Sequence, residues 1–112
     1  MLHRIRDRTT FVELGRRGRR AREGPVTVAH LADGSSPPRV AFAVGRRVGP
    51  AVVRNRVRRR LRSVLAEEVA TRGGLAPGPG AYLVSVRPAA ADASFDELGA
   101  AVRGALARLA GS

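Results

Sequence analysis

Residues 39–62 read RVAFAVGRRVGPAVVRNRVRRRLR, and the spacing of apolar side chains changes midway through this stretch. Over residues 39–44 large apolar side chains alternate with small or charged ones. This alternation predicts a strand with Val40, Phe42 and Val44 on one face. From residue 51 to residue 70 the period becomes helical. The apolar stripe of this expected helix consists of Val53, Val57, Leu61, Val64 and Leu65. The stretch therefore predicts a strand, a tight turn over residues 45–49 and a long helix.

The remaining segments extend this unit into a small α+β domain. We expect a helix over residues 7–17 capped by Thr9 or Thr10, an edge strand over 16–23, strands over 26–31 and 81–87, and a last helix from 95 to 111. Ser94 and Glu97 have the spacing of a capping box at the start of that last helix. The strands on either side of the long helix are expected to pair in parallel. We predict one domain over residues 1–112, a two-layer α-β sandwich with a small mixed sheet.

Charge dominates the composition. The 112 residues include 21 basic and 9 acidic side chains, a formal net charge of +12, and every basic one is arginine. So large an excess suggests a polyanionic partner. The absence of cysteine excludes disulfides and cysteine-ligated metals. No apolar run is long enough to span a membrane, and the N-terminal segment lacks the apolar core of a signal peptide, so we expect a cytoplasmic protein.

Arginines concentrate in the turn and the long helix. Residues 46–62 contain no acidic side chain and eight arginines: Arg46, Arg47, Arg54, Arg56, Arg58, Arg59, Arg60 and Arg62. Several of these stand four residues apart, where like charges repel and the fold is expected to gain nothing. A phosphate backbone would relieve the repulsion, so we interpret this face as binding nucleic acid. Asn55 has two open interpretations, an amide that binds RNA or one that fixes the first turns of the helix.

The few aromatic side chains divide into two groups. Phe42, Tyr82 and Phe95 stand in periodic apolar patterns and are expected in the core. Phe11 lies among polar and basic residues, so a core position and a base-stacking role are nearly balanced. His30 is expected to be packed or exposed on its strand rather than to act as a catalytic base. Adjacent carboxylates such as Glu67 and Glu68 point apart on a helix, so no cluster has metal-ligand spacing and no catalytic residue is assigned.

Residues 44–62 resemble the signature of the protein subunit of bacterial ribonuclease P. That signature is a strand end, two basic residues, a glycine, Ala-Val, and Arg-Asn-Arg leading into a basic helix. Further agreement lies in Arg6 and Arg8 before Phe11, and in residues 84–88 before Ser94. The resemblance implies an α-β sandwich with a left-handed crossover at the long helix. The family often has further aromatic residues at the positions of Gly15 and Ala29 here.

The resemblance also implies a function, the endonucleolytic removal of the 5′ leader from precursor tRNA. The partners would be the catalytic RNA, in a 1:1 complex, and precursor tRNA. The eight arginines and Asn55 would bind the catalytic RNA, and a cleft between the long helix and the sheet would hold the leader. We assign leader binding to Arg8, Phe11 and Arg39. Cleavage would use Mg²⁺ held mainly by the RNA. The alternatives are a general basic nucleic-acid-binding module and, less in keeping with the carboxylate spacing, a self-sufficient nuclease.

Overall fold

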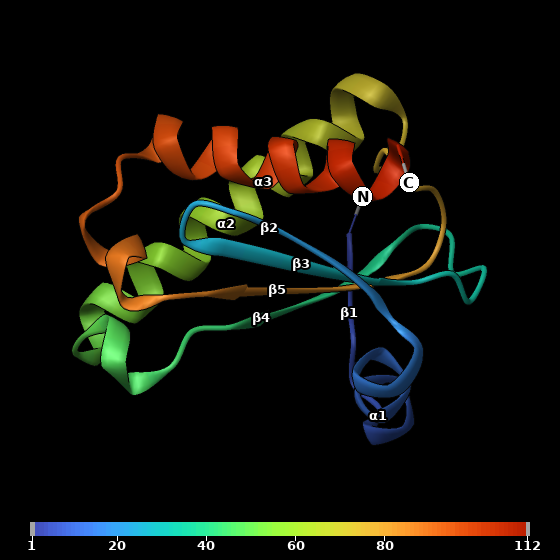
Figure 1. Ribbon diagram of the computed structural model, residues 1–112, viewed down its shortest axis with the longest axis horizontal. Coiled ribbons are helices and arrows are strands. Elements are labelled where there is room, and N and C mark those ends of the chain that lie inside the picture. The colour runs from blue at the N-terminus through green and yellow to red at the C-terminus, as the bar shows by residue number, and fades with distance from the viewer. Residues whose placement is uncertain (1, 112) are drawn as a thin grey trace.

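The computed structural model describes residues 2–111, and its elements follow the order expected from the sequence (Figure 1). The strands are β1 (His3–Arg4), β2 (Arg19–Glu23), β3 (Val26–Leu31), β4 (Arg39–Ala43) and β5 (Ala81–Val86). The helices are α1 (Arg8–Arg17), α2 (Ala51–Arg72) and α3 (Phe95–Gly111), with short 3-10 helices η1 (Arg46–Val48) and η2 (Pro88–Asp92). The sequence predicted neither the short 3-10 helices nor β1, whose pairing depends on a distant strand.

The five strands form one mixed sheet in the order β1-β4-β5-β3-β2. β4 and β5 pair in parallel across the α2 connection, which confirms the predicted crossover, and β3 pairs antiparallel with β5. The left hand of this crossover stays a prediction. β2 pairs only with β3 and is the sheet edge predicted for this charged segment. The described part of the chain contains no helix long and apolar enough to cross a membrane.

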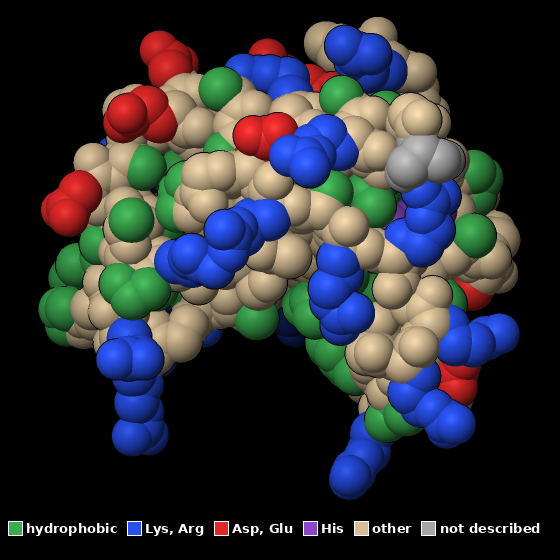
Figure 2. Space-filling model, viewed as in Figure 1, with side chains coloured by type: hydrophobic (Ala, Val, Ile, Leu, Met, Phe, Trp, Pro, Cys, Tyr) green, Lys and Arg blue, Asp and Glu red, His purple; other side chains and the backbone are tan. Residues whose placement is uncertain are grey.

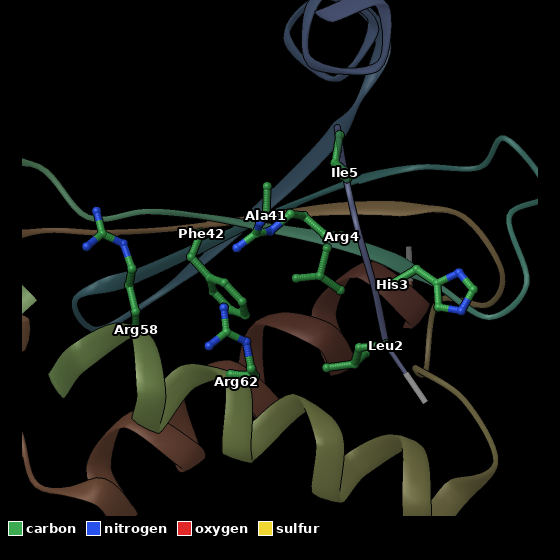
Figure 3. A pocket seen from close by; sticks show the side chains of 9 residues that line it. Leu2, His3, Arg4, Ile5, Ala41, Phe42, Arg58 and Arg62 are labelled. Atoms are coloured by element: carbon green, nitrogen blue, oxygen red, sulfur yellow. The ribbon is translucent and has the colours of Figure 1, made fainter. Parts of the chain in front are cut away.

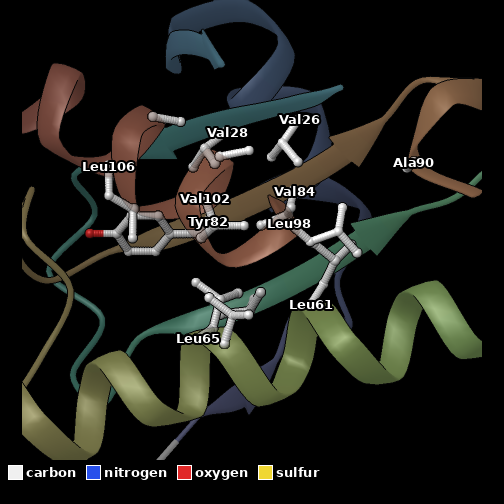
Figure 4. Close-up of a cluster of buried hydrophobic side chains, with 14 of the residues drawn as sticks. Val26, Val28, Leu61, Leu65, Tyr82, Val84, Ala90, Leu98, Val102 and Leu106 are labelled. Atoms are coloured by element: carbon white, nitrogen blue, oxygen red, sulfur yellow. The ribbon is translucent and has the colours of Figure 1, made fainter. Parts of the chain in front are cut away.

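The main core lies between one face of the sheet and helices α2 and α3 (Figures 1 and 4). Val57, Leu61, Val64 and Leu65 of the predicted stripe are buried there, as is Tyr82 of β5. Helix α1 lies on the opposite face of the sheet, where Leu14 packs with Ile5, Ala29, Leu31 and Ala81. Helix α1 covers only part of this face, so the rest of the sheet on the α1 side is uncovered (Figure 1).

Two helix starts show how well local sequence predicts capping. At α3, Glu97 N donates to Ser94 Oγ at 3.0 Å and Ser94 N donates to Glu97 Oε1 at 2.8 Å, as the capping box requires. At α1 the predicted Thr9 or Thr10 cap is wrong. Asp7 caps this helix, because its carboxylate accepts from both the N–H and the hydroxyl of Thr10. The second oxygen of this carboxylate accepts from Arg39, so Asp7 caps the helix and binds a cation at the same time.

Two of the expected core aromatic residues are not fully buried. Phe95 is 40% exposed at the first position of α3, so its core assignment is wrong. Phe42 is half-buried, because the sheet edge beside β4 is covered by the two-residue strand β1 alone. Tyr82 is completely buried and stacks on His30, with ring centroids 4.5 Å apart. Burial raises the pKa of the Tyr82 hydroxyl well above its usual range.

Candidate nucleic-acid interface

The turn that leads into α2 depends on one glycine conformation. Gly49 has φ +151°, a value that residues with a side chain rarely adopt. A Cβ at Gly49 would stand 3.2 Å from the side chain of Val53, so the turn lies close against the first turn of the helix. Val48 of η1 is buried in the main core. This fixed turn sets Arg46 and Arg47 on the surface at the beginning of α2, where both are exposed.

The arginines of residues 46–62 have no acidic partners among the described residues. Every ion pair found among residues 2–111 involves an arginine outside the 46–62 segment. Eight guanidinium groups therefore carry charge that the described part of the protein does not neutralise. We call the exposed members of this segment the basic face: Arg46, Arg47, Asn55, Arg59 and Arg62. Unpaired arginines on one surface are the electrostatic footprint expected of a nucleic-acid interface.

Three other arginines of α2 hold the surrounding backbone. Arg54 Nε donates to the carbonyl oxygen of Gly49 at 3.2 Å. Arg58 Nη2 donates to the carbonyl oxygen of Val44 at 3.3 Å, and Arg60 Nη1 to that of Ala93 at 3.1 Å. The expectation that the fold gains nothing from these charges is therefore wrong for all three. A guanidinium has five N–H donors, so each can hold a carbonyl and still offer donors to a phosphate.

Asn55 and Arg56 differ in their surroundings. Asn55 is exposed and its Oδ1 accepts a hydrogen bond from Arg58 Nη1 at 3.2 Å. It therefore orients a neighbouring arginine, and its amide nitrogen donates to no described residue. Arg56 is half-buried, and its Nε is shielded from solvent with no hydrogen-bond partner in the described part of the chain. The outward surface at the centre of α2 is thus formed by Asn55 and Arg59 rather than by Arg56.

The three residues assigned to leader binding lie near the first turn of α1. Arg8 is exposed, and Phe11 exposes 41% of its surface, which places it outside the core. Arg39 reaches this turn from β4, since its Nη1 donates to Asp7 Oδ1 at 2.8 Å and its Nη2 to Thr10 Oγ1 at 3.1 Å. The structure therefore brings Arg39 to the helix turn that carries Arg8 and Phe11, which precede it in the sequence by 31 and 28 positions.

Arg39 differs from Arg8 and Phe11 because its guanidinium N–H groups already donate hydrogen bonds within the protein. Besides its contacts with Asp7 and Thr10, it donates to Ser35 Oγ at 2.9 Å and to Asp33 Oδ2 at 2.7 Å. The hydrogen bond to Asp33 outweighs partial burial and, with that to Asp7, raises the pKa of Arg39. Burial opposes ionisation of Asp33, but hydrogen bonds from Ser35 and Arg39 lower its pKa. Arg39 thus connects β4, the loop after β3 and the start of α1.

The hydrogen bonds at Asp7 also affect its ionisation. The hydroxyl and the N–H of Thr10 lower the pKa of the Asp7 carboxyl to about 2, against the opposing effect of burial, and Arg39 adds to the lowering. The carboxylate is therefore ionised throughout the neutral range. It keeps the Arg39 guanidinium attached to the start of α1, the helix that carries Arg8 and Phe11.

A cavity of about 470 Å³ lies between α2, β4 and β1, where the sequence led us to expect the leader. Phe42, Arg58 and Arg62 line it, together with Arg4 of the unpredicted strand β1 (Figure 3). Phe11 and Arg8, which we assign to leader binding, do not line this cavity. Sequence reasoning missed Arg4 because nothing local places residue 4 beside residue 42.

A second concave region lies on the face of the sheet that carries α1. Figure 2 shows the molecule hollowed between α1 and the segment around η1, with basic side chains on both sides of the hollow. On this face of the sheet the half-buried Ala41 and Leu83 stand opposite each other in register, as do Thr27 and Ser85. Asp96 and Glu97 lie away from the hollow, in the first turn of α3 on the other face of the sheet, whereas α1 itself carries Glu13. Within residues 2–111 no three His, Asp or Glu side chains form a group that could hold a metal ion.

Comparison with known proteins gives a consistent result. The family model for Ribonuclease P matches residues 1–110. The ribonuclease P protein component of Nocardioides sp. is 47% identical over 100 residues, covering 86% of this chain and 81% of that protein. The corresponding protein of Acidothermus cellulolyticus is 44% identical over 110 residues, covering 96% and 88%.

Solved structures show the same fold. The ribonuclease P protein of Thermotoga maritima superposes with a TM-score of 0.77 at 19% identity, covering 98% of this chain and 97% of that one. A mutant ribonuclease P protein of Staphylococcus aureus superposes with a TM-score of 0.80 at 18% identity, covering 95% and 86%.

Proposed function

The chain belongs to the ribonuclease P protein family, and from that premise we propose that its basic face binds the catalytic RNA while the α1 side of the sheet binds the 5′ leader of precursor tRNA. As a member of this family, the chain takes part in tRNA 5′ processing. It is the protein part of an endoribonuclease that also contains an RNA subunit. Two different surfaces of this chain would bind the catalytic RNA and the leader. We also propose that residues 1–112 act as one domain, in a 1:1 complex with the RNA in the cytoplasm.

The observation that carries the proposal is the lack of acidic partners for the arginines of residues 46–62. Arg46, Arg47 and Arg59 are exposed, and Arg54, Arg58 and Arg60 retain donors beyond those that hold backbone carbonyls. Guanidinium groups form short, charge-assisted hydrogen bonds with phosphate oxygens. A helix that carries them along one side can follow an RNA backbone without reading its sequence.

Leader binding is supported by the second concave region. The hollow beneath the sheet is bounded by α1, which carries Arg8 and the exposed ring of Phe11. Single-stranded RNA binds where basic side chains contact its backbone and an aromatic ring stacks on a base. Arg39 serves here as a positioning residue, because its hydrogen bonds hold the start of α1 against β4.

Catalysis is assigned to the RNA. The Mg²⁺ that cleavage requires would be held mainly by RNA phosphates, where it supplies the charge stabilisation and activated water of a phosphodiester hydrolysis. The arginines of this chain would neutralise phosphates that repel one another when the RNA and its substrate come together. Less Mg²⁺ is then needed for the same purpose, so the protein should help most at low Mg²⁺.

The test is cleavage of precursor tRNA at low Mg²⁺ by catalytic RNA alone, by the protein alone and by the two combined. We expect product with a mature 5′ end only from the combination. Cleavage by rigorously RNA-free protein would overturn the assignment of catalysis to the RNA. Equal cleavage by catalytic RNA with and without the protein would instead indicate a general basic module.

A further inference from the structure

The cavity between α2, β4 and β1 has one aromatic wall and an apolar base. The ring of Phe42 forms the wall, and Leu2, Ile5 and Val40 contribute apolar surface (Figure 3). Its volume of about 470 Å³ is within the range of pockets that hold small organic groups. Phe42 is half-buried, so one part of its ring packs on the core and the rest is left to the cavity.

The polar side chains that line this cavity are three arginines and one histidine. Arg4, Arg58 and Arg62 line it together with His3, and no carboxylate is among its lining residues. Arg62 lies over the Phe42 ring, with its guanidinium carbon 5.5 Å from the ring centroid. In Figure 3, Arg4, Phe42 and Arg62 extend toward one another from three different elements, whereas His3 points away. Neither Arg4 nor Arg62 makes an ion pair with a described residue.

This chemistry matches one kind of occupant. A flat, uncharged ring can stack against Phe42 and the planar guanidinium of Arg62, and an attached anion can be bound by Arg4 and Arg58. An unpaired RNA nucleotide combines both features, since its base stacks on aromatic and guanidinium planes and its phosphate is anionic. The cavity adjoins the basic face, because Arg62 belongs to both. RNA bound along α2 would therefore pass its opening.

We propose that this cavity receives one unpaired nucleotide of the catalytic RNA, with its base against Phe42 and Arg62 and its phosphate beside Arg4 and Arg58. The inference rests on the proposed function and adds to it a pocket that holds a single base. It gives the protein a way to fix its register on the RNA, which phosphate contacts along α2 alone do not supply.

The experiment is chemical probing of the catalytic RNA, alone and with each protein, combined with affinity measurements. The variant Phe42→Leu keeps apolar volume and removes the stacking ring, and Phe95→Leu is the matched control on α3. We expect wild-type protein to protect at least one unpaired nucleotide that Phe42→Leu leaves reactive. We also expect Phe42→Leu to bind at least about fivefold more weakly, since a base–aromatic stack is lost. Phe95→Leu should match wild type in both measurements.

Unchanged protection and affinity in Phe42→Leu would overturn the proposal, as would Phe42-dependent protection confined to the leader of precursor tRNA. If circular dichroism shows that Phe42→Leu does not fold, the double variant Arg4→Gln/Arg62→Gln replaces it. That variant must leave reactive a nucleotide that wild-type protein protects and that the control Arg103→Ala, on α3, still protects. Failure of wild-type protein to bind the catalytic RNA would instead contradict the proposed function itself.

Discussion

Arg58 of α2 donates a hydrogen bond to the carbonyl oxygen of Val44, which follows β4, across 3.3 Å. This contact connects the middle of the basic helix with the end of the strand that precedes it, and Arg54 makes a similar contact with Gly49. The arginines of α2 therefore have two roles. Some hold the strand–turn–helix unit together, and others, such as Arg59, make no hydrogen bond or ion pair with a described residue and are left to a ligand.

Arg58→Ala and Arg59→Ala should separate these two roles. Loss of the Arg58 hydrogen bonds should lower the free energy of unfolding by about 1 kcal/mol, the usual net contribution of such a bond. Arg59→Ala should leave the free energy of unfolding within about 0.5 kcal/mol of wild type, because surface changes without contacts have small effects. Urea unfolding of the two variants measures this directly. Equal destabilisation by both would contradict the structural role of Arg58.

Gly49→Ala should destabilise the protein. Its φ of +151° and the 3.2 Å approach to Val53 leave no room for a relaxed side chain. We expect the free energy of unfolding to fall by more than about 1 kcal/mol, since alanine does not adopt this conformation without strain. Gly74→Ala is the matched control, because a Cβ there would meet nothing within 4 Å. A variant Gly49→Ala as stable as Gly74→Ala would show that the turn is not constrained.

Asp7→Asn should change how the free energy of unfolding depends on pH. Hydrogen bonds from Thr10 lower the folded-state pKa of Asp7 from 3.8 to about 2. A lowered pKa means that the carboxylate stabilises the fold fully above about pH 4 and loses this effect as the pH falls to about 2. Urea unfolding from pH 2 to pH 6 should therefore show a shallower decline for Asp7→Asn than for wild type. The control Asp92→Asn removes a carboxylate that accepts no hydrogen bond from described residues. Identical declines for wild type and Asp7→Asn would contradict the cap.

Phe11→Ala should weaken recognition of the leader without unfolding the protein. Its ring is 41% exposed on α1, and a stack on an RNA base contributes about 1–3 kcal/mol. The assembled enzyme should lose that much of its preference for precursor over mature tRNA, while the affinity for catalytic RNA stays the same. Val12→Ala, at a neighbouring position that is 44% exposed, is the matched control. Equal loss of discrimination in both variants would point to α1 as a whole rather than to stacking by Phe11.

Much of this fold follows from local sequence. The apolar stripe of α2, the strand over residues 26–31 and the Ser94–Glu97 capping box are confirmed, because each depends on residues within a turn or a strand of one another. The cap of α1 was mistaken because Asp7, Thr10 and Arg39 form one hydrogen-bonded group, and Arg39 joins it from 29 residues away. Local preference already ranks aspartate above threonine at such a position, so Asp7 was the better candidate from sequence alone.

The site was predicted less completely, since it depends on tertiary contacts. The concentration of arginines identified the basic face, but sequence does not show which guanidinium reaches a backbone carbonyl. Arg60 illustrates this, because its partner Ala93 is 33 residues away. Phe42 fits an apolar alternation, and its partial exposure arises only because β1 is too short to cover the sheet edge. The cavity beside it could not be found until β1 and α2 were placed.

The most direct test of the central claim is the salt dependence of binding to the catalytic RNA. Wild-type protein, Arg59→Ala and Arg103→Ala are compared, the last because Arg103 lies on α3 and pairs with Glu68 at 3.9 Å. If the basic face neutralises RNA phosphates, Arg59→Ala should reduce the slope of log K against log salt by roughly 0.7–0.9, the value for one phosphate contact. Arg103→Ala should leave that slope as in wild type. A slope that Arg103→Ala reduces and Arg59→Ala does not would contradict the account and place the RNA on the α3 side of the protein.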